Sequence, residues 1–142
     1  MKTIIKSLKE TKKYAKLFYK TLKGGEIILL NGDLGAGKTT FTKFLAECMG
    51  IKNPVTSPTF TLIQEYMGTN MGLIHCDMYR IEDESEVIEM GLEDMLYDMP
   101  SNKVAIIEWP NNIAGILKNL KTIKITIEKG EGDSRFITID KD

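Results

Sequence analysis

The sequence is poor in the residues that build cross-linked, metal-clustered or membrane-embedded proteins. Two of its 142 residues are cysteines, Cys48 and Cys76, and they form no C-x-x-C pair, so no disulfide framework is expected. No apolar run approaches the ~20 residues that cross a bilayer. No long apolar stretch follows the basic N-terminus, as it would in a secretory signal. We therefore expect one domain over residues 1–142, in the reducing cytoplasm and without membrane contact.

The sequence also lacks a strong net charge, which is −1, but its charges are segregated. Residues 1–23 carry eight lysines and one acid, whereas residues 81–100 carry eight acids and no lysine or arginine. Such segments are either solvated helix faces or surfaces that meet different partners, and the sequence leaves both alternatives open.

One motif dominates what is present. Residues 32–39, Gly-Asp-Leu-Gly-Ala-Gly-Lys-Thr, fit G-x-x-x-x-G-K-[ST], the phosphate-binding loop of P-loop proteins. The β-prone run 26–30 precedes the motif and the helical segment 40–49 follows it, which is the context that the motif requires. Backbone amides and the helix N-terminus bind phosphate there. In such loops the lysine, here Lys38, reaches the β- and γ-phosphates, and the hydroxyl of Thr39 ligates Mg²⁺.

The rest of the chain alternates apolar runs with helical periodicity, as α/β proteins do. We expect strands at residues 26–30, 61–66, 73–77, 104–107, 124–128 and 136–139. The second and third of these form a hairpin or neighbouring antiparallel strands, and the last two pair around a turn. The expected fold is α/β, a three-layer P-loop NTPase-like sandwich with a mixed, mainly parallel sheet and antiparallel edge strands. Its ligand should lie at the carboxyl ends of the strands.

Helices are expected at four places, residues 7–23, 40–49, 82–97 and 111–119. The first is expected to bury a stripe formed by Leu8, Thr11, Ala15, Phe18 and Leu22. Gly91 can split the third helix into two short ones, with Val87, Met90 and either Leu92 or Leu96 facing inward.

Two acids follow apolar strands and are candidates for the acid that a P-loop needs. Glu108 follows residues 104–107 and Asp77 follows residues 73–76. Either can ligate Mg²⁺ directly or through water, while the other orients the attacking water or the Lys38–Thr39 pair. Each can also be an ordinary acid at a strand end, and the spacing alone does not divide the roles.

The proline-containing loop 53–60 offers the hydroxyls of Thr56, Ser57 and Thr59, which can sense a γ-phosphate as switch segments do. The alternative is a plain connecting loop.

Three single residues leave their roles open. Trp109 can stack on a base or on a partner, or cap the core. His75 can be a base, but a structural histidine is the simpler interpretation. Arg80 can reach a phosphate or pair with an acid.

Several rival functions lack their signatures. A guanine-specific GTPase carries N-K-x-D, whereas residues 102–105 read Asn-Lys-Val-Ala. A small-molecule kinase, the main alternative, needs a cationic lid, but residues 81–100 are acidic. Direct nucleic-acid binding is indicated only by the lysines of the first helix.

Four motifs occur in order, namely residues 32–40, Thr-Ser-Pro-Thr-Phe at 56–60, His-Cys-Asp-Met-Tyr-Arg at 75–80 and Ile-Glu-Trp-Pro at 107–110. Together they closely resemble the bacterial TsaE (YjeE) family, over nearly the whole chain. The family usually has leucine where this chain has Met78, a change that conserves volume.

The resemblance implies a small P-loop ATPase that binds ATP or ADP with Mg²⁺ and hydrolyses ATP slowly. It implies a role in making N6-threonylcarbamoyladenosine at tRNA position 37, with the TsaD–TsaB heterodimer as partner and tRNA met only through that complex. A third possibility is a nucleotide-gated scaffold that does not catalyse.

The resemblance also implies site residues. Lys38, Asp77 and Glu108 would be catalytic, and Thr39 and Glu108 would hold Mg²⁺. The implied nucleotide contacts are Thr11, Leu34, Gly35, Ala36, Gly37, Lys38, Thr39, Thr40, Trp109 and Arg135.

Overall fold

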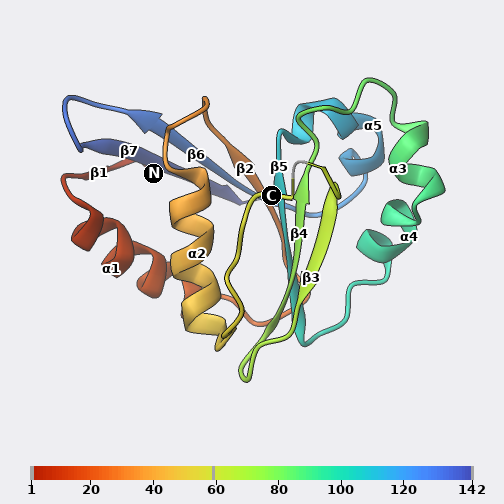
Figure 1. Cartoon of the computed structure of the whole chain (residues 1–142), viewed down its shortest axis with the longest axis horizontal. Coiled ribbons are helices and arrows are strands. Elements are labelled where there is room, and N and C mark those ends of the chain that lie inside the picture. Colours follow the sequence, from red (N-terminus) through yellow and green to blue (C-terminus); the bar gives the residue numbers. More distant parts are fainter. Residues whose placement is uncertain (1, 59, 142) are drawn as a thin grey trace.

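The structure is a computed structural model that describes residues 2–58 and 60–141, and its elements form one mixed α/β sheet with helices on both faces (Figure 1). Their bounds are β1 Lys2–Ile5, α1 Leu8–Tyr19, β2 Ile27–Asn31, α2 Lys38–Met49, β3 Ile63–Tyr66, β4 Gly72–Asp77, α3 Ser85–Glu89, α4 Leu92–Tyr97, β5 Lys103–Glu108, the 3-10 helix η1 Pro110–Ile113, α5 Ala114–Leu117, β6 Ile123–Lys129 and β7 Arg135–Lys141.

The sheet has seven strands in the order β1-β7-β6-β2-β5-β4-β3. The four strands β6, β2, β5 and β4 are parallel, whereas β7, β1 and β3 pair antiparallel with their neighbours. Leu30 pairs with Glu108, and Glu108 pairs with Asp77. The carboxyl ends of three parallel strands therefore meet at one edge of the sheet, where both candidate acids and the phosphate loop lie.

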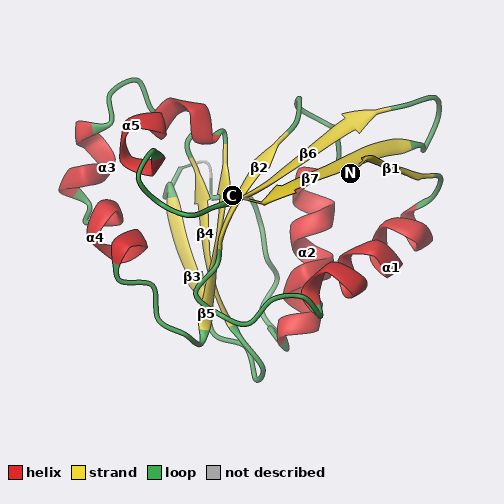
Figure 2. Ribbon diagram, turned by 180° about the vertical axis from the view of Figure 1, so that it is seen from behind, coloured by secondary structure: helices red, strands yellow, loops and turns green. Residues whose placement is uncertain are grey.

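Helices α1 and α2 cover one face, and α3, α4 and α5 cover the other (Figures 1 and 2). Side chains alternate along each strand, so the sheet supplies two cores. Ile28 and Leu30 pack in the core with Phe41 of α2. Ile27 and Leu29 pack in the other core with Leu92 of α4. The expected three-layer arrangement is confirmed.

Helix α1 is shorter than expected. Ser7 caps its start by accepting a hydrogen bond from the Glu10 amide at 3.2 Å. The helix ends at Tyr19 instead of residue 23, because the amide of Thr21 bonds the Phe18 carbonyl three residues back and the Thr21 hydroxyl bonds the same oxygen.

Two predicted core residues are exposed, and one strand was not predicted. Leu8 is 65 % exposed at the start of α1, and Met90 is 45 % exposed at the turn that Gly91 makes between α3 and α4. Strand β1 pairs with β7, and a four-residue edge strand has too little periodicity to be recognised.

The other expected elements begin and end within three residues of their predicted bounds. The β3–β4 hairpin, the split of the acidic segment at Gly91 and the β6–β7 pair are confirmed. The helix expected over 111–119 is instead η1 followed by one turn of α5. In the described part of the chain, no helix has the length and apolarity that crossing a membrane demands.

Candidate nucleotide-binding site

A cavity of about 590 Å³ opens at the carboxyl edge of the sheet. Its walls come from the phosphate loop, the start of α1, the ends of β4 and β5, and the β6–β7 hairpin. The twelve site residues that the family resemblance implies all line this cavity, although their roles stay predictions. They are Thr11, Leu34, Gly35, Ala36, Gly37, Lys38, Thr39, Thr40, Asp77, Glu108, Trp109 and Arg135.

The phosphate loop owes its shape to two glycines. Gly37 caps α2 with φ 106°, a left-handed conformation that side chains disfavour. A Cβ atom on Gly32 would lie 2.6 Å from the Ile127 carbonyl oxygen of β6, so the loop could not approach that strand with any other residue. The loop is thereby held between β6 and the N-terminus of α2.

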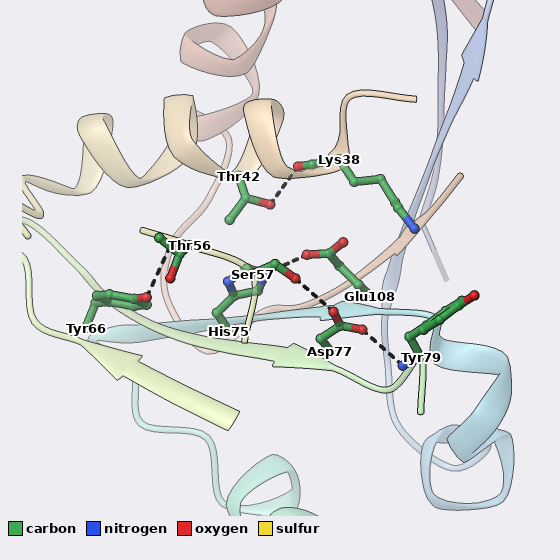
Figure 3. Close-up of polar contacts among 9 residues, drawn as sticks. All are labelled: Lys38, Thr42, Thr56, Ser57, Tyr66, His75, Asp77, Tyr79 and Glu108. Atoms are coloured by element: carbon green, nitrogen blue, oxygen red, sulfur yellow. Dashed lines mark hydrogen bonds and ion pairs between the residues drawn. The ribbon is translucent and has the colours of Figure 1, made fainter. Parts of the chain in front are cut away.

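Lys38 is the least satisfied polar residue of the site. Its side chain extends from the start of α2 toward the region of Glu108 and Tyr79 (Figure 3). The residue is 5 % exposed, and Nζ has no hydrogen-bond partner among the described residues. It lies 4.0 Å from the centroid of the Trp109 ring. Burial lowers the pKa of Lys38, and the nearby Glu108, Asp77 and Asp33 oppose that shift.

A buried ammonium without a hydrogen-bond acceptor is costly, and a cation over an aromatic ring recovers part of that cost. A bound phosphate would supply the missing acceptor oxygens. The orphaned Nζ atom therefore fits a phosphate-bearing ligand in this cavity.

Asp77, at the end of β4, accepts hydrogen bonds at both carboxylate oxygens (Figure 3). The Ser57 hydroxyl donates to Oδ2 at 2.9 Å, and the Tyr79 amide donates to Oδ1 at 3.0 Å. The residue is buried. The loop that contains Ser57 is thus attached to one of the two candidate acids, and Ser57 itself lines the cavity.

Glu108, the other acid, ends β5 beside Asp77 and is also buried. Its Oε2 atom lies 2.7 Å from Nε2 of His75. His75 is therefore bonded to a candidate catalytic acid, a contact that the sequence left open.

Trp109 follows Glu108 in a left-handed conformation with φ 56°. Its ring packs against Tyr79 in a tilted arrangement, with the ring centroids 4.9 Å apart, and Lys38 Nζ lies over its face. The residue is half-buried and lines the cavity, so it belongs to the site and does not simply cap the core.

Arg135 supports the phosphate loop. Its Nε donates to the Ala36 carbonyl at 2.9 Å, and its Nη1 donates to the Ser134 and Gly132 carbonyls at 2.8 and 3.2 Å. The sequence predicts a contact to nucleotide, and the contact within the chain is an additional role that no sequence pattern indicates.

Other candidates lie outside the cavity. Arg80 is exposed, 4.6 Å from the Phe60 ring centroid, and does not line it. Thr56 also stays outside, and its amide contacts the Tyr66 hydroxyl at 3.5 Å. Thr59 is not among the described residues.

The cavity also has lining residues that sequence reasoning missed. They are Leu8, Tyr79, Ile127, Asp133 and Ile137. Tyr79 could have been found from its place two residues after Asp77. The other four residues belong to no motif in the sequence, and only the fold brings them to the cavity.

The donor set fits Mg²⁺ bound mainly through phosphate and water. Over the described ranges, no three His, Cys, Asp or Glu side chains gather as a metal site of their own. Mg²⁺ in nucleotide sites typically takes one or two protein oxygens, and its other ligands are phosphate and water. Thr39 and Glu108 both line the cavity and could supply such oxygens.

The fold and the motif together define an α/β protein with a P-loop sequence at a strand–helix turn. Residues 5–137 match the family described as "Threonylcarbamoyl adenosine biosynthesis protein TsaE". The chain belongs to this family.

The chain is similar to named relatives over most of its length. It is 44 % identical over 129 residues to the "tRNA threonylcarbamoyladenosine biosynthesis protein TsaE" of Bacillus subtilis, covering 91 % of this chain and 78 % of that protein. The protein of the same name from Aquifex aeolicus is 50 % identical over 93 residues, covering 63 % and 70 % of the two chains. The crystal structure of Bacillus subtilis YdiB matches with a TM-score of 0.79 and 36 % identity, covering 98 % of this chain and 83 % of that one.

Proposed function

We propose that this protein binds ATP and ADP with Mg²⁺ in the cavity at the carboxyl edge of the sheet and hydrolyses ATP slowly. The observation that carries the proposal is the buried Nζ of Lys38, which has no hydrogen-bond partner among the described residues and lines a cavity beside two carboxylates. A triphosphate supplies the anionic oxygens that this atom lacks.

Each residue has a role that its position suits. Amides of residues 34–39 and the N-terminus of α2 bind the phosphates, with Lys38 reaching the terminal ones. The Thr39 hydroxyl and Glu108 Oε1 would hold Mg²⁺. Mg²⁺ held there would neutralise negative charge on the phosphates. Asp77 accepts a hydrogen bond from the attacking water, and the Ser57 hydroxyl keeps that carboxylate oriented.

The slow intrinsic rate follows from the shortage of cations. Among the described residues that line the cavity, the cations are Lys38 and Arg135, and Arg135 is engaged with backbone carbonyls. Lys129 approaches the phosphate loop at Gly35 but does not line this cavity. Arg80 lies over Phe60, outside the cavity. A further cation near the transferring phosphate would raise the rate, and a partner protein can provide or position one.

The cellular role that we propose is the formation of N6-threonylcarbamoyladenosine on tRNA, with the TsaD–TsaB heterodimer as partner. Family membership and the names of the relatives support it. In this role the protein associates with tRNA only indirectly, through its complex with TsaD–TsaB.

Phosphate release tests the activity. The purified chain should release phosphate from ATP slowly, TsaD–TsaB should accelerate the release, and Glu108→Gln should abolish it in both conditions. Phosphate passing to an added hydroxyl compound instead of water would favour a small-molecule kinase. Wild-type partner activity in Glu108→Gln would instead favour a nucleotide-gated scaffold.

A further inference from the structure

His75 occupies a position in β4 that strand alternation assigns to the core. It pairs with Ile106 of β5 on one side and with Gln64 of β3 on the other. Leu73 and Asp77, two residues away in each direction, share its face of the strand. Leu73 packs in the core under α2, and His75 itself is 0 % exposed. An apolar side chain is the usual occupant of such a position.

Of the two ring nitrogens of His75, Nε2 makes a polar contact and Nδ1 does not. Its Nε2 lies 2.7 Å from Glu108 Oε2, and its Nδ1 has no hydrogen-bond partner in the part of the chain that is described (Figure 3). A carboxylate accepts hydrogen bonds, so the contact is a hydrogen bond in the tautomer that carries the hydrogen on Nε2. A buried nitrogen without a partner destabilises the fold.

This arrangement is a poor way to stabilise the protein. Replacing a buried polar pair with well-packed apolar residues is often neutral or stabilising. A buried polar side chain that is not fully hydrogen-bonded is typical of functional sites, where the side chain serves the function and not the stability of the fold. The contact here is with the acid that faces the cavity.

The effect of the contact is to fix the Glu108 carboxylate. With Oε2 bonded to His75, the carboxylate cannot turn freely about its last bond, and Glu108 lines the cavity. Atoms that orient a metal-ligating side chain in this manner raise the affinity for the metal.

We propose that His75 is a positioning residue that fixes Glu108 through Nε2 and so presents Oε1 to the Mg²⁺ of a bound nucleotide. This inference depends on the proposed function, because it assumes that nucleotide and Mg²⁺ share the cavity. It assigns His75 no contact with nucleotide.

A pair of amide substitutions separates the contact from the packing. In His75→Gln the side-chain amide can reach the position of Nε2, whereas in His75→Asn it reaches only as far as Nδ1. The measurement is ADP affinity with and without Mg²⁺ by calorimetry, which needs no turnover. In the wild type, Mg²⁺ should raise the affinity for ADP. We expect the factor by which Mg²⁺ raises it to be about tenfold smaller in His75→Asn. His75→Gln should retain most of this gain. Without Mg²⁺, all three proteins should bind ADP alike.

Two further variants are controls. In a Glu108→Gln background, His75→Asn should change the Mg²⁺-dependent gain no further, because the histidine acts through that carboxylate. Leu73→Val alters buried packing on the same face of β4 and should leave the gain unchanged. If either amide variant fails to fold, the other is still compared with the wild type, since their expected results are opposite.

The outcomes distinguish this inference from the function on which it depends. If the wild type gains affinity from Mg²⁺ and His75→Asn gains as much, the inference is overturned and the proposed function stands. An equal loss in His75→Gln also overturns it, since packing would then be the cause. A wild type that binds no ADP overturns the proposed function and this inference with it.

Discussion

Arg135 in β7 donates a hydrogen bond from Nε to the carbonyl of Ala36, in the phosphate loop 99 residues earlier, at 2.9 Å. The same side chain bonds the Ser134 and Gly132 carbonyls in the β6–β7 turn. The last strand in the sequence is thus attached to the loop that we propose binds phosphate, so a residue far along the chain supports that loop.

Substituting Arg135 should therefore weaken nucleotide binding. A hydrogen bond from a charged group contributes about 1.5–3 kcal/mol, so Arg135→Gln should lower ADP affinity by roughly tenfold or more. Arg80→Gln, which changes the other arginine of the chain, should have no effect on ADP affinity. Calorimetry on both variants measures this, and equal affinities would contradict the supporting role of Arg135.

The contact between Lys38 and Trp109 provides an optical signal. Trp109 is the sole tryptophan, and Lys38 Nζ lies 4.0 Å from its ring centroid. A bound phosphate should draw the ammonium away from the ring, so ADP should change the fluorescence of the wild type. Lys38→Met should show no comparable change on addition of ADP. An identical change in that variant would mean that the signal does not come from Lys38.

Much of this arrangement could be predicted from the sequence because local patterns carry it. The glycines and Lys38 of the phosphate loop form a contiguous motif, and Asp77 and Glu108 each end an apolar run. Once these strands are parallel, their ends must meet at one edge. That inference needs no knowledge of side-chain geometry.

The features that were missed depend on pairings that no local pattern encodes. Arg135 meets Ala36 only because β7 follows β6 back along the sheet, and His75 meets Glu108 only because β4 lies beside β5. Strand β1 has four residues, too few for a recognisable pattern, so its pairing with β7 determines its structure. Leu8 was expected in the core, but the first turn of α1 leaves it exposed on the rim of the cavity.

The contact between Ser57 and Asp77 should affect hydrolysis more than binding. Ser57→Ala removes the hydroxyl that donates to Oδ2, so the carboxylate is less well oriented for a water molecule. We expect ATP hydrolysis to fall by about tenfold, with ADP affinity nearly unchanged. Thr56→Ala is the control, because Thr56 lies outside the cavity and its amide is retained. A rate in Ser57→Ala equal to that in Thr56→Ala would exclude this role.

The two cysteines should differ in reactivity. Cys76 is fully buried, and burial raises its pKa to about 12, whereas Cys48 is partly exposed. Because the thiolate is the reactive form, an alkylating reagent at pH 8 should label Cys48 in the folded protein and Cys76 only after unfolding. Peptide mass spectrometry gives the labelled positions, and early modification of Cys76 would contradict its burial.

The same pKa shift predicts a pH dependence of stability. Below pH 9 the Cys76 thiol is protonated in both the folded and the unfolded chain, and its titration contributes nothing. Between pH 9 and about 12 the unfolded chain loses the proton first, so the free energy of unfolding should fall relative to Cys76→Ala. Denaturant titrations of both proteins at several pH values in this range give the free energy of unfolding as a function of pH. Parallel curves for the two proteins would contradict the raised pKa of Cys76.

The central claim is that the cavity beside Lys38 binds the phosphates of an adenine nucleotide. Titrating ADP into the purified protein in magnesium buffer, by calorimetry, tests it most directly. We predict saturable binding to the wild type and a loss of roughly tenfold or more in Lys38→Ala, which keeps the glycine loop but lacks the ammonium. No uptake of ADP by the folded wild type, or equal affinity in Lys38→Ala, would contradict the claim.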